Sequence, residues 1–228
     1  MSVAERLSVV RARIAAAAEL VGRSPADIRL VAVSKTRSAS EVDAACQAGQ
    51  TVFGENYVQE LLNKADNVDL PVEWHFIGHL QSNKVRQIAG LVTLIHSVDR
   101  QSLAEEISRQ WGRIGKCCDV LVQVNISGET TKSGTTEVDA MQLVKAVARL
   151  PHVKITGLMT MPPFFDDPEA AQPYFAALKS LSQRIAAECI PGVEMRELSM
   201  GMSGDFEVAI QEGATLVRVG TAIFGERD

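Results

Sequence analysis

The sequence predicts a closed α/β barrel of eight parallel strands, a (β/α)8 or TIM barrel, in a single domain over residues 1–228 with an extra helix at the N-terminus. Two observations support this prediction: the chain has eight short apolar segments, and seven of them are followed by a helical pattern. Short apolar strands separated by helices are typical of a parallel sheet that is covered on both faces. Eight such units in roughly 200 residues favour a closed barrel. A doubly wound open sheet is the alternative architecture.

The first predicted element is a helix over residues 4–21, because apolar side chains recur there at spacings of three and four residues: Leu7, Val10, Ile14 and Ala18. Ser24-Pro25 then interrupts the chain, and Ser24 is placed to cap the short turn that follows.

Strands and helices alternate from there to the end of the chain. The predicted strands cover residues 30–33, 51–53, 73–77, 92–95, 119–124, 153–158, 197–199 and 216–219. The predicted helices cover residues 39–48, 136–150 and 169–187, and others begin near Tyr57, Lys84, Gln101 and Asp205. The Pro-rich loop 161–168 is either a lid or a plain connection.

Composition and charge narrow the functional class. The formal net charge is -5 and the pI is near 5.5, which disfavours binding to nucleic acid or to an anionic membrane surface. The chain has no signal-peptide pattern and no apolar run long enough to span a membrane, so we expect a cytoplasmic protein. Four cysteines without CxxC spacing predict free thiols rather than a disulfide framework or a zinc site.

Lys35 is the most informative candidate for chemistry. It ends the first predicted strand, and functional groups of such barrels lie at the C-terminal ends of the strands. Partial desolvation at the barrel mouth lowers the pKa of a lysine and favours the neutral amine, which attacks an aldehyde to form an imine. Taken alone, Lys35 fits a surface lysine at a strand end somewhat better than a reactive amine.

Two glycine-rich turns follow the last two predicted strands and form the second candidate feature. The loops after strands seven and eight often bind phosphate in barrels, because glycine lets the backbone N–H groups approach an anion. Ser203 and Thr221 add hydroxyl donors to these turns. Opposite a lysine on strand one, the two turns point to a phosphorylated aldehyde.

Two further features are weaker. His75 and His79 are four residues apart across a strand end and a turn, so we expect no zinc pair. His75 is either a core or rim histidine or a group near a bound ring. Lys132 lies in the polar loop 128–134, where we expect it to be solvated.

Several motifs along the chain resemble those of the pyridoxal phosphate homeostasis proteins, a family similar to the barrel of alanine racemases. The motifs are Ala32-Val33-Ser34-Lys35-Thr36, Phe53-Gly54-Glu55-Asn56-Tyr57, Trp74 to Lys84, Gly157-Leu158-Met159-Thr160-Met161, Leu198 to Phe206, and Val217 to Gly225. The resemblance implies a barrel of the alanine racemase N-terminal domain type that binds pyridoxal 5'-phosphate.

The resemblance also implies a role for each site residue. Lys35 holds the cofactor as a covalent aldimine, and Arg218 lies beside the pyridine nitrogen. The remaining cofactor-binding residues are Asn56 and His75 near the ring, and Met202, Ser203, Gly220 and Thr221 at the phosphate. Because arginine only donates hydrogen bonds, Arg218 disfavours protonation of the ring nitrogen, which makes the ring a poor electron sink.

These observations favour a non-catalytic carrier that keeps pyridoxal phosphate as a Schiff base and passes it to apo forms of pyridoxal phosphate-dependent enzymes. The sequence ends at Asp228, soon after the last predicted strand, so we expect none of the C-terminal β-domain that racemases use. The first alternative is a racemase or related enzyme with Tyr57 or His75 as acid/base. The second is an aldolase-like barrel with a Schiff-base lysine and no cofactor. Since a closed barrel has no exposed edge strand, we expect a monomer.

Overall fold

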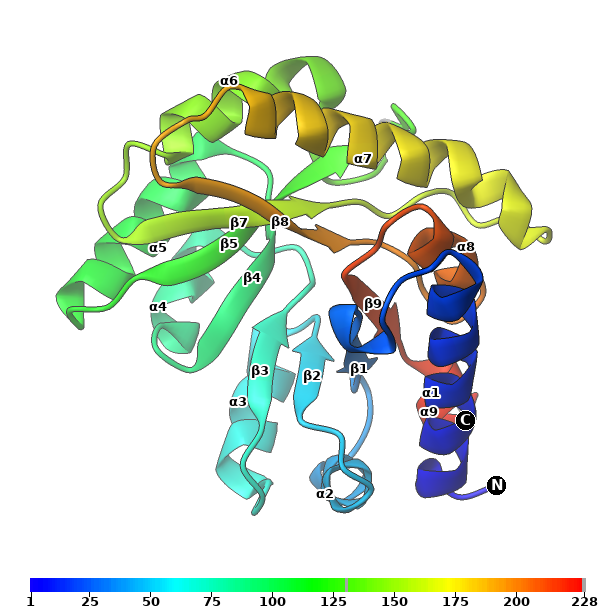
Figure 1. Ribbon diagram of the computed structural model, residues 1–228. Helices are drawn as coiled ribbons and strands as arrows, with labels where there is room; N and C mark the ends of the chain where they lie inside the picture. The colour runs from blue at the N-terminus through cyan, green and yellow to red at the C-terminus, as the bar shows by residue number, and fades with distance from the viewer. Residues whose placement is uncertain (130, 227–228) are drawn as a thin grey trace.

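Residues 1–129 and 131–226 are described by a computed structural model, and parallel strands form its centre (Figure 1). Among these residues, eight strands pair in the order β1-β2-β3-β4-β5-β7-β8-β9, and β9 pairs back with β1. Their bounds are β1 Arg29–Val33, β2 Val52–Glu55, β3 Glu73–Phe76, β4 Val92–Val98, β5 Cys118–Asn125, β7 Val153–Met159, β8 Val193–Ser199 and β9 Leu216–Val219. The sheet is closed, so the predicted barrel is confirmed and the open sheet is excluded.

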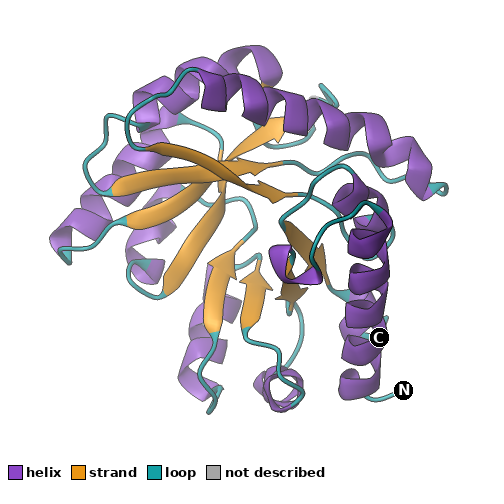
Figure 2. Ribbon diagram, viewed as in Figure 1, coloured by secondary structure: helices purple, strands orange, loops and turns teal. Residues whose placement is uncertain are grey.

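Helices surround the strands and connect their ends (Figure 2). The α-helices are α1 Val3–Leu20, α2 Ala39–Gln47, α3 Val58–Asn67, α4 Val85–Ile88, α5 Gln101–Arg113, α6 Glu137–Val147, α7 Gln172–Ala187, α8 Phe206–Gln211 and α9 Thr221–Phe224. Short 3-10 turns cover Pro25–Asp27, Ser82–Lys84 and Pro168–Ala171. Local signals start several helices: Ser38 caps α2 in a capping box with Glu41, and Ser24 caps the first 3-10 turn.

The N-terminal helix α1 covers the side of the barrel where the last outer helices are short. It packs against α2, α8 and α9, and its apolar stripe of Leu7, Val10 and Ile14 is buried. Arg13 lies over the ring of Phe206, with its guanidinium carbon 4.6 Å from the ring centroid. The predicted extra helix is therefore present, and it closes the outer layer beside the β8 and β9 ends.

The barrel has two cores of different character. The larger apolar core lies between the strands and the surrounding helices. A second, small apolar cluster takes one residue from each of six strands: Val31, Val52, Leu94, Leu121, Met159 and Leu216. The side chains of His75, His96, Ser199 and Arg218 are buried as well, so much of the barrel's interior is polar.

The structure differs from the predicted elements at a few positions. β8 begins at Val193 instead of residue 197, because Glu194 and Arg196 hide the start of the strand from an apolar pattern. The helix predicted from Lys84 shrinks to a 3-10 turn and the four-residue α4. Neither α9 nor the two-residue strand β6, Thr135–Thr136, which pairs with β5, is predicted.

Two further expectations concern the cysteines and membrane-spanning helices. All four cysteines, which lie in the described residues, are free. Within the same part of the chain, no helix is long and apolar enough to cross a membrane.

Candidate functional site

A pocket of about 660 Å³ lies at the C-terminal ends of the strands. Seven of the eight predicted site residues line it: Lys35, Asn56, Met202, Ser203, Arg218, Gly220 and Thr221. They come from the turn after β1, from the loops after β2 and β8, and from β9 with the turn that follows it. The barrel thus brings together residues that are up to 186 positions apart in sequence, and one predicted residue, His75, lies elsewhere.

The turn that carries Lys35 is held from below by α3. Thr36 has a φ of 64°, an unusual left-handed conformation for a residue with a side chain. The Thr36 N–H donates to the carboxylate of Glu60 at 2.7 Å, and Lys64 Nζ donates to the carbonyl oxygen of Ser34 at 2.5 Å. Contacts on both sides of Lys35 therefore fix the backbone from which its half-buried side chain extends.

Lys64 belongs to a buried polar network under this turn. Its Nζ donates to Glu55 Oε1 at 2.6 Å, and Ser34 Oγ donates to the same oxygen at 2.6 Å. Burial raises the pKa of Glu55, while the hydrogen bonds from Lys64 and Ser34 oppose that shift. Sequence reasoning missed this network; the spacing of Glu60 and Lys64, i and i+4 on one helix, was its only local signal.

The loops after β8 and β9 meet at Ser203. The Ser203 hydroxyl oxygen accepts hydrogen bonds from the backbone N–H groups of Gly220 at 3.2 Å and Ala222 at 3.4 Å. Gly201 turns the first loop with a φ of 90°, and a Cβ there would lie 2.6 Å from Ala209. Hydroxyls, backbone N–H groups and glycines thus converge as the sequence predicted for a phosphate site.

Arg218 forms the buried wall of the pocket. Its side chain is 4% exposed; its Nη1 donates to Ser199 Oγ at 2.6 Å, and its Nη2 donates to the Thr160 carbonyl oxygen at 2.9 Å. Burial lowers the pKa of Arg218 to about 10, with Asp205 opposing the shift, so the group stays charged at neutral pH. The pocket therefore contains a fixed positive charge that can only donate hydrogen bonds.

Asn56 is positioned by a close approach of two backbones. Gly78 lies so near that a Cβ on it would be 2.2 Å from the carbonyl oxygen of Asn56. The Asn56 Oδ1 atom is buried and has no hydrogen-bond partner among the described residues. A buried acceptor without a partner is costly. A ligand with a hydroxyl or N–H donor at this point would satisfy it, which fits the substituted ring of pyridoxal phosphate.

The prediction that His75 touches the cofactor is not supported by its position. His75 lies on β3, fully buried inside the barrel, and does not line the pocket. Its Nε2 is 3.0 Å from Glu73 Oε1, and its Nδ1 is 3.0 Å from His96 Nε2. Glu73 begins β3, so this side chain is directed towards the N-terminal end of the barrel. This position agrees with the alternative prediction, in which His75 is a histidine of the protein core.

The apolar wall of the pocket was missed by sequence reasoning. Ile77 and the loop 161–168 contribute it, and Phe164 in that loop is 87% exposed although it lines the pocket. Phe165 packs against Tyr174 with ring centroids 5.7 Å apart, which ties the loop to α7. That this loop acts as a lid remains a prediction. In the loop 128–134, Thr130 lies outside the described residues, and Lys132 pairs with Glu129 at 3.3 Å.

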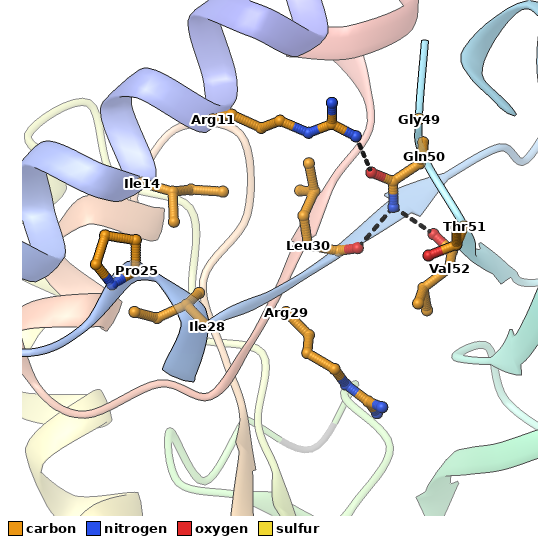
Figure 3. A pocket seen from close by; sticks show the side chains of 10 residues that line it. All are labelled: Arg11, Ile14, Pro25, Ile28, Arg29, Leu30, Gly49, Gln50, Thr51 and Val52. Atoms are coloured by element: carbon orange, nitrogen blue, oxygen red, sulfur yellow. Dashed lines mark hydrogen bonds between the residues drawn. The ribbon is translucent and has the colours of Figure 1, made fainter. Parts of the chain in front are cut away.

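A second pocket, of about 320 Å³, lies at the opposite end of the barrel, beside α1 and the starts of β1 and β2 (Figure 3). Gln50 donates to the carbonyl oxygens of Leu30 at 2.7 Å and Val52 at 2.8 Å, and accepts from Arg11 at 3.4 Å. Gln50 thereby satisfies backbone groups where the strands begin. This arrangement stabilises the fold and offers no comparable set of groups for chemistry.

The fold and the larger pocket together define a class of protein: a closed parallel barrel with a pocket at the C-terminal ends of its strands, lined by a lysine, a buried arginine and two glycine-containing loops. The chain belongs to the pyridoxal phosphate homeostasis proteins, within the broader family described as alanine racemase, N-terminal domain, whose profile matches residues 6–228. The family resemblance seen in the sequence is confirmed.

Particular relatives cover essentially the whole chain. A protein of Aquifex aeolicus named pyridoxal phosphate homeostasis protein is 46% identical over 228 residues, which span 100% of this chain and 99% of that protein. The structure of PipY from Synechococcus elongatus with PLP bound has a TM-score of 0.86 at 36% identity, and the match covers 98% of this chain and 100% of PipY. An alanine racemase of Clostridium difficile shares the fold, with a TM-score of 0.76 at 15% identity over 98% of this chain and 57% of the racemase.

Proposed function

We propose that this protein binds pyridoxal 5'-phosphate in the larger pocket, holds it as a Schiff base on Lys35, and serves as a non-catalytic carrier that releases it to apoenzymes. The observation that carries the proposal is the convergence of Lys35, the Ser203 loop and Arg218 on one pocket. The name of the Aquifex relative and the PLP-bound structure of PipY support the choice of ligand. We also propose that the carrier works as a monomer in the cytoplasm.

Each group in the pocket has a task that suits this ligand. When bound, pyridoxal phosphate supplies an aldehyde, which condenses with an amine and releases water. Lys35 Nζ provides the amine, and the turn held by Glu60 and Lys64 orients it. At the other end of the pocket, the Ser203 oxygen accepts from the Gly220 and Ala222 N–H groups, so its own hydrogen is left to donate to a phosphate oxygen, and Thr221 adds a second hydroxyl.

Arg218 sets the character of the ring end. Because a guanidinium donates and does not accept, Arg218 binds a pyridine nitrogen that has no proton of its own. An unprotonated ring withdraws electrons weakly, so carbanion chemistry at a substrate is poorly supported. This property suits storage of the aldehyde better than turnover.

The positions of the two candidate acid/base residues also favour the carrier over the racemase. His75 is enclosed in the barrel interior, and Tyr57, which is 58% exposed, is not among the residues that line the pocket. A proton donor or acceptor must come within hydrogen-bonding reach of the reacting atom. Incubation of the holoprotein with a panel of amino acids tests this point, and sustained turnover beyond the bound cofactor would refute the carrier.

Borohydride reduction tests the covalent link directly. Adding pyridoxal phosphate to the purified protein should produce an absorbance band of the Schiff base, and borohydride should fix one equivalent of cofactor on the peptide that contains Lys35. Lys35→Ala should lose both signals. Lys116→Ala is the matched control, because Lys116 is exposed at the start of β5, at the opposite end of the barrel. Equal labelling of the Lys35→Ala and control proteins would contradict the proposal.

A transfer assay tests release. The holoprotein should restore activity to an apo form of a pyridoxal phosphate-dependent enzyme, and the borohydride-reduced holoprotein should not. If both restore activity equally, the recovered activity comes from cofactor bound elsewhere.

A further inference from the structure

A continuous row of hydrogen-bonded side chains crosses the barrel interior and ends on Arg218. Glu73 Oε1 is 3.0 Å from His75 Nε2, and His75 Nδ1 is 3.0 Å from His96 Nε2. His96 Nδ1 is 2.8 Å from Ser199 Oγ, which accepts from Arg218 Nη1 at 2.6 Å. The row joins β3, β4, β8 and β9, and leads from the N-terminal end of the barrel to the ligand pocket.

The chemistry of the two ends sets one order of protons along this row. Arg218 can only donate, so Ser199 Oγ accepts from it and keeps its own hydrogen to give to His96 Nδ1. His96 then bears its proton on Nε2 and donates to His75 Nδ1. His75 in turn bears its proton on Nε2 and donates to the carboxylate of Glu73. Each hydrogen is used once, and each bond has one donor and one acceptor.

The surroundings favour this neutral state of both histidines. Burial lowers the pKa of His75 and lowers that of His96 further, and the positive charges of Arg218 and Arg29 act in the same direction on His96. Glu73, and to a lesser degree Glu197, oppose the shift at His75. Both imidazoles can therefore serve as one-donor, one-acceptor links.

The position of these hydrogen-bonded side chains indicates that they do more than fill the space inside the barrel. Apolar side chains fill a barrel interior without the cost of burying polar groups, and here an apolar cluster of six residues already does so beside the row. The row occupies one N–H donor, on Nη1, of the Arg218 guanidinium, which lines the pocket. A second bond, from Arg218 Nη2 to the carbonyl oxygen of Thr160, completes a two-point attachment of the same group.

We infer that Ser199, His96 and His75 are positioning residues for Arg218: they lock the guanidinium in the plane and orientation in which its remaining donors face the pyridine nitrogen of the bound cofactor. This inference rests on the proposed function, because it assigns the ring end of that pocket. Glu73 anchors the row at the far end, where it also accepts from Thr93 at 3.1 Å.

The test combines the apo-protein and the cofactor-loaded protein. Nitrogen-15 NMR of histidine-labelled apo-protein should show His75 and His96 as neutral rings protonated at Nε2. In Ser199→Ala, Arg218 loses one anchor, so the Kd for pyridoxal phosphate should rise about 3- to 10-fold and the absorbance band of the bound cofactor should shift. Borohydride should still fix one equivalent on Lys35, because the lysine turn is untouched.

Ser97→Ala is the matched control. Ser97 is a buried serine on β4, next to His96, and its hydroxyl has no hydrogen-bond partner among the described residues. It should leave the Kd and the band as in wild type, and Ser199→Thr, which keeps the hydroxyl, should restore both in large part. Identical binding and spectra for Ser199→Ala and Ser97→Ala, or rings protonated at Nδ1, would overturn the inference. If wild type itself takes up no cofactor, the proposed function fails, and the inference with it.

Discussion

The two ends of the ligand pocket are built in opposite ways. The end that we propose for the phosphate, called the phosphate end below, consists of two loops, where exposed or half-buried residues such as Ser203 and Thr221 present hydroxyls and backbone N–H groups. The other side rests on buried side chains: Lys64 and Glu55 support the turn of Lys35, and Ser199 and His96 hold Arg218. The phosphate end is therefore made of short loop segments that are open to water. The opposite side is supported by side chains from separate strands and helices, and these side chains are buried away from water.

This difference has an energetic consequence. A polar group near water can exchange a lost partner for solvent, so a change at the phosphate end should weaken binding and leave folding almost intact. A polar group inside the barrel has no such exchange, so a change there leaves an unsatisfied partner in a region of low dielectric. Mutations at the two ends should therefore separate into effects on affinity and effects on stability.

The largest expected effect comes from the buried ion pair under Lys35. Lys64→Met leaves Glu55 buried without its cation, and should lower the free energy of unfolding by about 3–5 kcal/mol. Urea unfolding followed by circular dichroism measures this value. The double variant Lys64→Met/Glu55→Leu removes both charges and should recover at least half of the loss. If the single variant is as stable as wild type, the network is not the support that its geometry indicates.

The same contrast explains how much was predictable from sequence. Apart from the charged start of β8, the strands are largely apolar runs, and the loops at the phosphate end are short glycine motifs that follow two of them, so both could be found from local patterns. Lys35 and Arg218 stand at strand ends, where barrels place their functional groups. The buried partners of Arg218 could not be found this way: Ser199 and His96 meet only after the barrel closes, and each is an ordinary strand residue in the sequence. The family resemblance implied His75 as a residue near the ring, and its motif shows neither the contacts with Glu73 and His96 nor its place outside the pocket lining.

The second prediction concerns the acid side of the stability curve. His75 and His96 have pKa values below the ordinary value of 6.5, so the unfolded chain binds more protons below pH 6.5, and stability should fall as the pH drops from there. The slope is at most about 1.4 kcal/mol per pH unit for each histidine. Glu73, with its pKa lowered to about 2, adds stability that is present above its unfolded value of 4.5 and is lost only as the pH falls towards 2.

Unfolding free energies measured at pH 7, 6 and 5 check this slope. His96→Gln should reduce the slope between pH 6.5 and 5 by about one proton, because the glutamine side chain does not titrate. Ser97→Ala is the control, since Ser97 is a buried neighbour of His96 whose hydroxyl does not titrate in this range, and it should keep the wild-type slope. An unchanged slope in His96→Gln would mean that the buried ring is already protonated in the folded protein.

The third prediction tests the phosphate end. Ser203→Ala removes the hydroxyl that joins the two loops and should raise the Kd for pyridoxal phosphate about 10-fold, equivalent to about 1.4 kcal/mol. Its free energy of unfolding should change by less than about 1 kcal/mol, because the Gly220 and Ala222 N–H groups become available to water. Fluorescence titration and urea unfolding give the two numbers. A large loss of stability with unchanged affinity would reverse the assignment of this end.

The smallest effect is expected at Thr221, an exposed residue of the phosphate end. Thr221→Val keeps the shape of the side chain and the backbone N–H but removes the hydroxyl, so the Kd should rise only about 3-fold and stability should stay within about 0.5 kcal/mol of wild type. Inorganic phosphate gives the sharper measurement, because it competes for this end alone: its inhibition constant against pyridoxal phosphate should rise by the same factor in Thr221→Val and stay unchanged in Ser199→Ala. A parallel change in both variants would mean that the two ends of the pocket are coupled, and that the buried row through His96 acts on the phosphate loops as well as on the ring.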